Sequence, residues 1–293
     1  MSRYSRRDFL KASAAAGAAA AIGTVPLPAE TPKATDWVAL GKSDVKVTRL
    51  AFGTGSFNGS VQRDLGQESF NRLVRHAYDS GIRFFETADS YADMHTMLGI
   101  ALKGLPRDSY ALMTKVTTFD GTDPHQRIDE LRRQVQSDYF DVMLLHWQRG
   151  TEWPHETTGW QEAIDQAQHR GAVRIRGASV HGLPALAQVP AFNWLQVAMI
   201  RCNHKGTRMD TPVADGPGQG DVPEVVQRIH QARAAGMGVV SMKLIGEGVF
   251  NREDRQKAMR FAFRDAKVDA VTVGYKNNAE IDEAIQNINM AYA

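Results

Sequence analysis

Residues 84–91 read FFETADSY, an apolar strand that ends in a polar turn. Glu86 and Tyr91 fall where the strand gives way to a loop, and parallel α/β proteins bind ligands at that point. Two later strand ends repeat the pattern, because Lys115 and His146 each follow an apolar run. Polar side chains at three consecutive strand ends predict one functional site at the carboxyl edge of a parallel sheet.

The same alternation of strand and helix continues along most of the chain. The predicted strands cover residues 50–53, 83–87, 110–114, 141–145, 173–178, 194–199, 238–242 and 270–273. The predicted helices cover residues 68–79, 95–102, 124–135, 159–169, 183–188, 223–235, 253–264 and 280–290. Eight such units predict an α/β fold of the closed (β/α)8 or TIM-barrel type. A Rossmann unit is not indicated, because Gly53-Thr54-Gly55 does not match G-x-G-x-x-G.

Three features lie outside this repeat. Residues 37–47 place turn residues between two apolar runs, which predicts a β-hairpin ahead of the barrel. Residues 203–222 form a long polar loop rich in glycine and proline, which predicts a lid over the site. Three tryptophans follow the fourth strand and either wall a substrate pocket or pack in the core: Trp147, Trp153 and Trp160.

The N-terminal segment is predicted to lie outside the fold. Arg6-Arg7 precedes an Ala/Gly-rich run over residues 12–25, an order that resembles a twin-arginine export signal. We therefore expect a signal and linker over residues 1–35, a barrel over residues 36–293, and the twin-arginine export machinery as a partner. The expected location is outside the cytoplasm, and the periplasm in a Gram-negative bacterium. The run is too short and too poor in large apolar residues for a stable membrane span, so none is expected beyond the signal.

Composition excludes several classes of function and of site. The chain of 293 residues is long enough for one barrel, which usually needs about 250. A net charge of +2 gives no electrostatic case for binding nucleic acid. The single cysteine, Cys202, excludes an intramolecular disulfide and a cysteine-rich metal cluster, and we expect it to be a small buried side chain. The histidines lack H-E-x-x-H spacing, so no metal site is predicted.

The residues from Phe85 to Tyr91, with Leu98-Gly99, Lys115 and His146, resemble the aldo-keto reductases. The resemblance runs from about residue 37 to the C-terminus and implies a (β/α)8 barrel that reduces a small-molecule carbonyl with NADP(H). It implies that Tyr91 is the proton donor, that Lys115 lowers the pKa of its phenol and that His146 orients the carbonyl. Glu86 stands where the family usually has an aspartate.

Elementary chemistry supports these roles. Reduction of a carbonyl creates an alkoxide, which needs a proton or a close hydrogen bond. A tyrosine, with a reference pKa of about 10, keeps its proton at neutral pH. A nearby ammonium such as that of Lys115 stabilises the phenolate, and a carboxylate such as that of Glu86 holds the lysine in place.

The resemblance also implies an NADP(H) site. Ser179 and Gln196 are expected to hold the nicotinamide carboxamide, and Met242 replaces a tyrosine that often stacks on the ring. Lys243 is expected to meet the pyrophosphate and Lys276 the adenosine 2′-phosphate, although no second arginine follows Lys276 where the family has one. The implied cofactor residues are Gly53, Thr54, Ser179, Gln196, Met242, Lys243, Gly274, Lys276, Asn277 and Glu280.

Two other functions remain open from the sequence. A metal-dependent barrel of the sugar-isomerase kind would need several inward-facing Glu, Asp or His ligands at strand ends. A non-catalytic binding barrel is favoured by the departures from the family pattern at Glu86, Val180 and Met242. Binding of NADPH by the purified protein separates the reductase from both alternatives.

Overall fold

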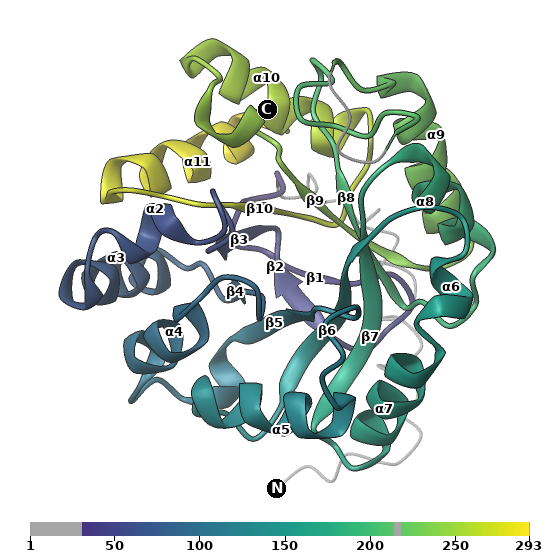
Figure 1. Cartoon of the computed structure of the whole chain (residues 1–293). Coiled ribbons are helices and arrows are strands. Elements are labelled where there is room, and N and C mark those ends of the chain that lie inside the picture. Colours follow the sequence, from purple (N-terminus) through teal and green to yellow (C-terminus); the bar gives the residue numbers. More distant parts are fainter. Residues whose placement is uncertain (1–30, 214–217, 293) are drawn as a thin grey trace, which may run out of the picture. The chain divides into compact units, whose positions relative to one another are not determined.

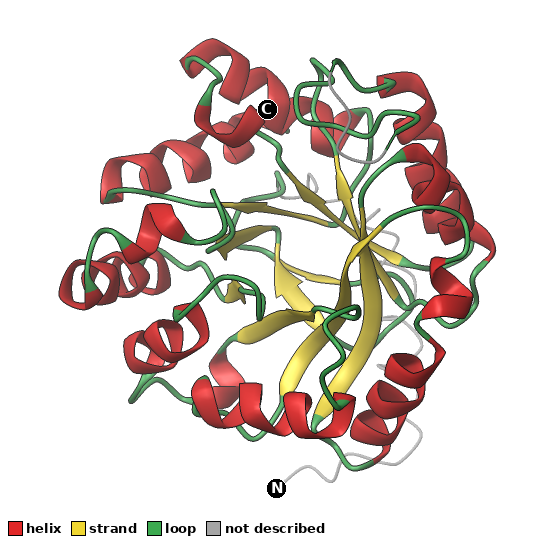
Figure 2. Ribbon diagram, in the orientation of Figure 1, coloured by secondary structure: helices red, strands yellow, loops and turns green. Residues whose placement is uncertain are grey.

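The eight predicted strands form one closed parallel barrel. The computed structural model describes residues 31–213 and 218–292. Residues 1–30 of the predicted signal and linker therefore lie outside the described residues, and the boundary at residue 35 stays a prediction. The barrel strands are hydrogen-bonded in the order β10-β3-β4-β5-β6-β7-β8-β9, and β9 pairs with β10 to close the ring. In Figures 1 and 2 the helices surround these strands, which confirms the predicted (β/α)8 fold. The strands are β3 (Leu50–Gly53), β4 (Phe84–Glu86), β5 (Ala111–Val116), β6 (Phe140–Gln148), β7 (Val173–Val180), β8 (Val197–Arg201), β9 (Gly238–Met242) and β10 (Ala270–Val273).

The helices form because their apolar residues recur at helical spacing. In α3, the side chains of Phe70, Leu73, Val74 and Ala77 are buried against the barrel. Four longer helices begin at an Asp or Asn whose side chain accepts a backbone amide of the first turn. The α-helices are α2 (Ser60–Arg63), α3 (Gln67–Asp79), α4 (Met94–Leu102), α5 (Pro124–Gln134), α6 (Trp153–Glu156), α7 (Thr158–His169), α8 (Leu183–Gln188), α9 (Val222–Ala234), α10 (Arg252–Arg264) and α11 (Asn278–Ala291), and the 3₁₀ helices are η2 (Arg107–Ser109), η3 (Val189–Ala191) and η4 (Gly246–Gly248).

The predicted hairpin is present as β1 (Trp37–Ala39) and β2 (Lys46–Thr48), which pair antiparallel. Its turn lies against the amino-terminal end of β9, where the amide of Lys42 donates to the carbonyl of Gly236 at 2.9 Å. Gly41 has a φ of +59°, and a Cβ there would lie 2.3 Å from the backbone nitrogen of Gly238. A side chain at residue 41 is therefore excluded both by conformation and by contact.

Apolar residues alternate between the two faces of each strand. Phe84, Met113 and Leu144 belong to a cluster inside the barrel, together with the hairpin residue Leu40. Their neighbours along the strands belong to a second cluster between the strands and the helices. Because the period is two, the residue two positions beyond each interior residue also faces inward. This places Glu86, Lys115 and His146 on the inner face at the carboxyl end of the barrel.

The strand boundaries differ from prediction in two places that affect the site. β6 extends to Gln148, with a register shift between Leu145 and Gln148 against β7, so His146 lies within the strand instead of directly after it. β8 begins at Val197, three residues later than predicted. Cys202 is a buried free thiol next to the end of β8, as expected, and burial raises its pKa to about 12.

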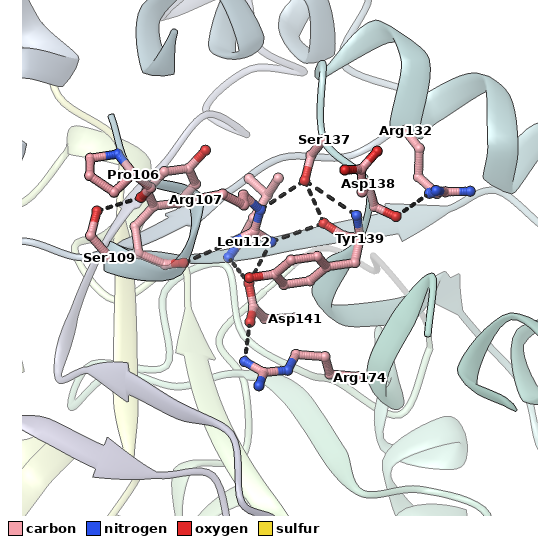
Figure 3. Close-up of polar contacts among 11 residues, drawn as sticks. Pro106, Arg107, Ser109, Leu112, Arg132, Ser137, Asp138, Tyr139, Asp141 and Arg174 are labelled. Atoms are coloured by element: carbon pink, nitrogen blue, oxygen red, sulfur yellow. Dashed lines mark hydrogen bonds and ion pairs between the residues drawn. The ribbon is translucent and has the colours of Figure 1, made fainter. Parts of the chain in front are cut away.

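A polar network joins three strands at the opposite, amino-terminal end of the barrel. The Asp141 carboxylate accepts hydrogen bonds from the guanidinium groups of Arg107, at 2.7 Å, and Arg174, at 3.1 Å, and from the amide of Leu112 at 2.9 Å. Figure 3 shows Asp141 between the two guanidinium groups. The Arg107 guanidinium also lies 3.8 Å from the centre of the Tyr139 ring. The position of this Asp141 network at the amino-terminal end of the barrel indicates a role in stability and not in catalysis.

We expect Asp141→Asn to lower the free energy of unfolding by about 3 kcal/mol, because two guanidinium groups then lose their buried counter-charge. Arg174→Gln is the control, since the Arg174 side chain is 54% exposed and exposed ion pairs contribute about 0.5 kcal/mol. Urea unfolding of the three proteins measures the difference. Equal losses in the two variants would show that Asp141 does not organise the network.

Candidate active site

Three polar side chains from consecutive strands and one from a loop meet at the carboxyl end of the barrel. Glu86 ends β4, Lys115 lies near the end of β5 and His146 lies near the end of β6. Tyr91 follows β4 in the loop that leads to α4. The register pairs Glu86 with Met113 and Lys115 with Leu144. Each site residue therefore lies two positions beyond the partner of the preceding one, on the same inner face at the carboxyl end of the barrel. The sequence prediction that these residues converge is correct.

Lys115 and Glu86 form a buried ion pair. Their exposed fractions are 1% and 2%, and the Lys115 ammonium contacts Oε1 of Glu86 directly. The ammonium also donates to the carbonyl oxygen of Thr87 at 3.0 Å. The second carboxylate oxygen of Glu86 accepts a hydrogen bond from the hydroxyl of Thr272 at 3.2 Å. The extra methylene of glutamate therefore does not separate the carboxylate from the lysine.

Tyr91 lies directly beside this ion pair. The Lys115 Nζ atom is 4.8 Å from the centre of the Tyr91 ring. The ring of His146 meets the Tyr91 ring edge-on, with the two centres 5.6 Å apart. On another side, a Cβ on Gly55 would lie only 2.6 Å from the Tyr91 hydroxyl. The backbone of Gly55 thus packs against the phenol, and a side chain there would displace it.

The buried position of the site sets its protonation states. Burial raises the pKa of Tyr91, and the negative charges of Asp89 and Glu247 act in the same direction. Burial lowers the pKa of His146, and so do the positive charges of Lys115, His181 and Lys243. Burial and the charge of Lys243 also lower the pKa of Lys115, while the Glu86 carboxylate supplies the compensating negative charge. At neutral pH the site therefore offers a protonated phenol and a neutral imidazole.

A cavity of about 390 Å³ opens beside Tyr91 and Glu86. Its wall comes from the ends of β3, β8, β9 and β10 and from the segment that contains η4. Six residues predicted to contact a cofactor line it: Gly53, Met242, Lys243, Gly274, Lys276 and Glu280. The two predicted cations, Lys243 and Lys276, thus line the same cavity as Tyr91 and Glu86.

Comparison with known proteins agrees with this arrangement. Residues 49–289 match the sequence profile described as the Aldo/keto reductase family. The chain belongs to the aldo/keto reductase family. Its members are oxidoreductases that act on carbonyl groups and generally use NAD(P)H. Residues 3–23 match a twin-arginine translocation pathway signal sequence, which directs export across the membrane.

Individual relatives of this aldo/keto reductase are distant. The L-galactose dehydrogenase of Arabidopsis thaliana is 34% identical over 37% of this chain and 37% of that protein. Probable aldo-keto reductase 1 of Glycine max is 25% identical over 73% of this chain and 60% of that protein. The matched regions thus span less than two thirds of either relative. A putative aldo-keto reductase of Pseudomonas aeruginosa has the same fold, with a TM-score of 0.72 at 19% identity over 89% of this chain and 98% of the other. The holo form of aldo-keto reductase AKR11C1 from Bacillus halodurans also has this fold, with a TM-score of 0.68 at 20% identity. The match covers 86% of this chain and 90% of that chain.

Three predicted cofactor residues of this aldo/keto reductase lie next to the cavity wall in supporting positions. The hydroxyl of Thr54 donates to the backbone carbonyl of Glu86 at 3.0 Å. The Asn277 side chain accepts the amide of Glu280 at 3.0 Å and caps α11. Ser179 is fully buried, and its hydroxyl oxygen accepts the amide of Trp147 at 3.0 Å. The side chains of Thr54, Asn277 and Ser179 are thus engaged with neighbouring backbone.

The prediction for Gln196 is wrong. Gln196 precedes β8 and lies at the amino-terminal end of the strand, away from the cavity. Its side-chain oxygen accepts the amide of Arg176 at 3.1 Å and the side-chain amide of Gln168 at 3.1 Å. Met199, three residues further along and within β8, lines the cavity instead.

Arg255 is a cavity residue that the sequence analysis did not predict. It comes from α10, one strand before Lys276 along the chain, and it lines the same cavity. Its guanidinium makes two parallel hydrogen bonds to Glu283, at 2.8 and 3.0 Å. No local motif marks this residue. The structure therefore supplies a second cation where the sequence offered only Lys276.

The loop predicted to be a lid braces the cavity wall over its first half. The side-chain amide of Asn203 donates to the backbone carbonyl of Lys243 at 3.2 Å. Asp210 is fully buried, and its carboxylate accepts the amide of Gly182 at 2.7 Å and Nε of Arg201 at 2.9 Å. These buried bonds fix residues 203–211 against the barrel, so this part is a support and not a lid. Residues 214–217 lie outside the described part of the chain.

The three tryptophans separate into two roles. Trp153 is fully buried and Trp160 is 7% exposed, so both pack in the core. Trp147 directly follows His146 and has a φ of +57°, which is rare for a bulky side chain. Its ring lies 5.6 Å from that of Phe119. Among the three, only Trp147 stands beside the proposed catalytic residues.

Two further observations concern metals and membranes. Among residues 31–213 and 218–292, no three His, Cys, Asp or Glu side chains are grouped so that they could hold a metal ion. Within the same part of the chain, no helix combines the length and the apolar character that crossing a membrane requires.

Proposed function

We propose that this protein is an NADPH-dependent reductase that converts an aldehyde, ketone or sugar carbonyl to an alcohol, with Tyr91 as the proton donor. The observation that carries the proposal is the buried Lys115–Glu86 ion pair beside the Tyr91 ring, at the wall of a cavity that also holds Lys243 and Lys276. A binding barrel without chemistry would not need a buried charge pair against a phenol.

The residues of the cavity fit a dinucleotide. Lys243, Lys276 and Arg255 are cations suited to phosphate groups. The backbone of Gly274 lines the cavity, and a Cβ there would lie 2.6 Å from the Ser56 hydroxyl oxygen. The Met242 thioether offers an apolar contact for a flat ring. In this proposal Lys243 meets the pyrophosphate and Lys276, with Arg255, meets the 2′-phosphate.

The bound reduced nicotinamide supplies the hydrogen and the electron pair that the carbonyl carbon receives. Tyr91 gives its phenolic proton to the carbonyl oxygen as negative charge develops there. The Lys115 ammonium stabilises the phenolate that remains, and Glu86 holds the ammonium in place. The Nδ1 atom of His146 lies 3.2 Å from the Ser90 hydroxyl. When Ser90 donates to Nδ1, the proton of the neutral imidazole is on Nε2 and is available to the substrate oxygen.

Two experiments test this function. NADPH fluorescence during titration with the purified protein measures binding, and consumption of NADPH with a panel of aldehydes, ketones and sugars measures turnover. The expected result is saturable binding and turnover of at least one carbonyl. Binding without turnover across the panel would favour a non-catalytic barrel. Absence of NADPH binding would remove the proposal.

Lys276→Ala should weaken NADPH binding by about tenfold and leave NADH binding unchanged, because only NADPH carries the 2′-phosphate charge. Lys257→Ala is a matched control, since Lys257 is an exposed lysine on α10 paired with Glu253. Dissociation constants for both cofactors in the three proteins measure the effect. The assignment fails if Lys276→Ala discriminates between the cofactors as well as wild type.

We also propose that the exported protein works outside the cytoplasm, in the periplasm of a Gram-negative host. Replacement of Arg6 and Arg7 by lysine should leave the protein in the cytoplasm, because the arginine pair identifies the signal. Arg3→Lys makes the same chemical change outside the pair and should leave export intact. Cell fractionation and immunoblotting measure the distribution. Unchanged delivery of the Arg6/Arg7 variant would contradict the assignment.

A further inference from the structure

The carboxylate of Glu86 connects two strands that are not neighbours in the barrel. One oxygen contacts the ammonium of Lys115 on β5, and the other accepts the Thr272 hydroxyl of β10 at 3.2 Å. β3 lies between β4 and β10 and pairs with both. The Glu86 side chain therefore passes across the inner face of β3 to reach Thr272.

The Glu86 side chain can pass across β3 because the β3 residue beside it is a glycine, Gly53. Gly53 pairs with Glu86 in the sheet register. A Cβ on Gly53 would lie 2.4 Å from the Thr272 hydroxyl oxygen and 3.1 Å from Oε2 of Glu86. Even the smallest side chain would therefore force the hydroxyl and the carboxylate apart.

The length of Glu86 suits this crossing. An aspartate would end about 1.5 Å earlier, the length of one carbon–carbon bond, and would lose reach toward β10. Thr272 is β-branched and 8% exposed, so its side chain has few rotamers and holds its hydroxyl in a fixed position. A neutral hydroxyl can fix the carboxylate without competing with Lys115 for its charge.

We propose that Thr272 is a positioning residue, whose hydroxyl anchors one oxygen of Glu86 so that the other holds the Lys115 ammonium beside Tyr91. In this proposal Thr272, which lines the cavity, acts through Glu86. The inference rests on the proposed reductase function, but it concerns how this chain uses a glutamate at that place. Glu86, Thr272 and Gly53 then form one unit, in which the glycine gives the room and the threonine gives the anchor.

The charges around Lys115 make the unit sensitive to small movements. Glu86 contacts the ammonium from β4, and His146 and Lys243 act on the site from β6 and from the end of β9. Tyr91 faces the ammonium from the loop after β4. Because Lys243 opposes the charge on Lys115, the position of the Glu86 carboxylate decides how well that charge is compensated.

The test compares Thr272→Val, which keeps the shape and removes the hydroxyl, with Thr272→Ser, which keeps the hydroxyl. We expect Thr272→Val to lower kcat about tenfold, the effect of one hydrogen bond to a charged group, with the KM for NADPH unchanged. The alkaline limb of its pH–rate profile for carbonyl reduction should move to higher pH, because a displaced Lys115 no longer lowers the phenol pKa. Thr272→Ser should recover most of the rate and the wild-type profile.

A double-mutant cycle tests whether Thr272 acts through Glu86. Glu86→Asp should lower kcat, since the shorter side chain cannot reach both partners. In that background Thr272→Val should have little additional effect, because the hydrogen bond is already lost. Additive losses in the double variant would overturn the inference.

A readout without turnover separates this inference from the proposed function. In protein labelled with ¹³C at the lysine Cε, the Lys115 signal is identified by its absence from Lys115→Met. It should titrate at lower pH in Thr272→Val than in wild type or Thr272→Ser, since the ammonium loses part of its counter-charge. Identical titration in the three proteins overturns the role of Thr272. If the wild-type protein reduces no carbonyl but the Lys115 titration still shifts in Thr272→Val, the reductase function is overturned and the positioning role is supported.

Discussion

Tyr91→Phe is expected to lower the rate of carbonyl reduction by about 10²–10⁴, because it removes the positioned acid from the site. The change deletes one oxygen and little volume, and the ring contacts with His146 and Lys115 remain. NADPH affinity should therefore stay near the wild-type value. Steady-state kinetics, together with NADPH fluorescence titration, measure both quantities.

Tyr78→Phe is the matched control for Tyr91→Phe. The Tyr78 hydroxyl bonds to Ser109, and Tyr78 lies on α3 in the outer layer, so its loss should leave the rate unchanged. Wild-type turnover by Tyr91→Phe would end the proposed mechanism and leave the binding barrel as the better account.

Lys115→Met should reduce the rate by a similar factor of about 10²–10⁴. Without the ammonium, the pKa of the Tyr91 phenol rises further above its ordinary value, and the phenolate left after proton transfer loses its stabilising charge. The phenol stays protonated to higher pH, so the alkaline limb of the pH profile should move upward. Rates measured across pH at saturating NADPH give the shift.

Loss of stability must be distinguished from loss of chemistry in Lys115→Met. Removing one partner of a buried ion pair typically costs about 3–5 kcal/mol, because the remaining charge is uncompensated. The double variant Lys115→Met/Glu86→Gln removes both charges and should recover most of the free energy of unfolding without recovering activity. Recovery of activity in the double variant would show that Lys115 has a structural role only.

Much of this site could be predicted from local sequence. Glu86, Lys115 and His146 each stand two positions beyond an apolar residue that faces the barrel interior, so the period of two places them on one face. Parallel strands then bring their carboxyl ends to one edge. The order of Tyr91, Lys115 and His146 along the chain was sufficient to indicate both the family and the chemistry.

Gln196 shows where this local reasoning fails. Its residue type suits an amide contact with a nicotinamide, but β8 begins at Val197, so Gln196 precedes the strand at the amino-terminal end of the barrel instead of lying within it. A sequence pattern determines that a strand exists more reliably than where it starts. The function of a strand residue depends on that starting point, because position along the strand sets the end of the barrel that it faces.

The sequence by itself determined the alternation of strands and helices, the inner face of each strand and the polar residues at three strand ends. Those features depend on neighbours a few positions apart. Only the tertiary structure decided that Thr272 bonds to Glu86, that Gly53 leaves room for that bond and that Arg255 joins Lys276 at one cavity. For Thr272, Gly53 and Glu86 the physical reason is closure of the barrel, which pairs β10 with β3 and brings residues from distant parts of the chain together. For Arg255 and Lys276 it is the packing of α10 beside the segment that follows β10.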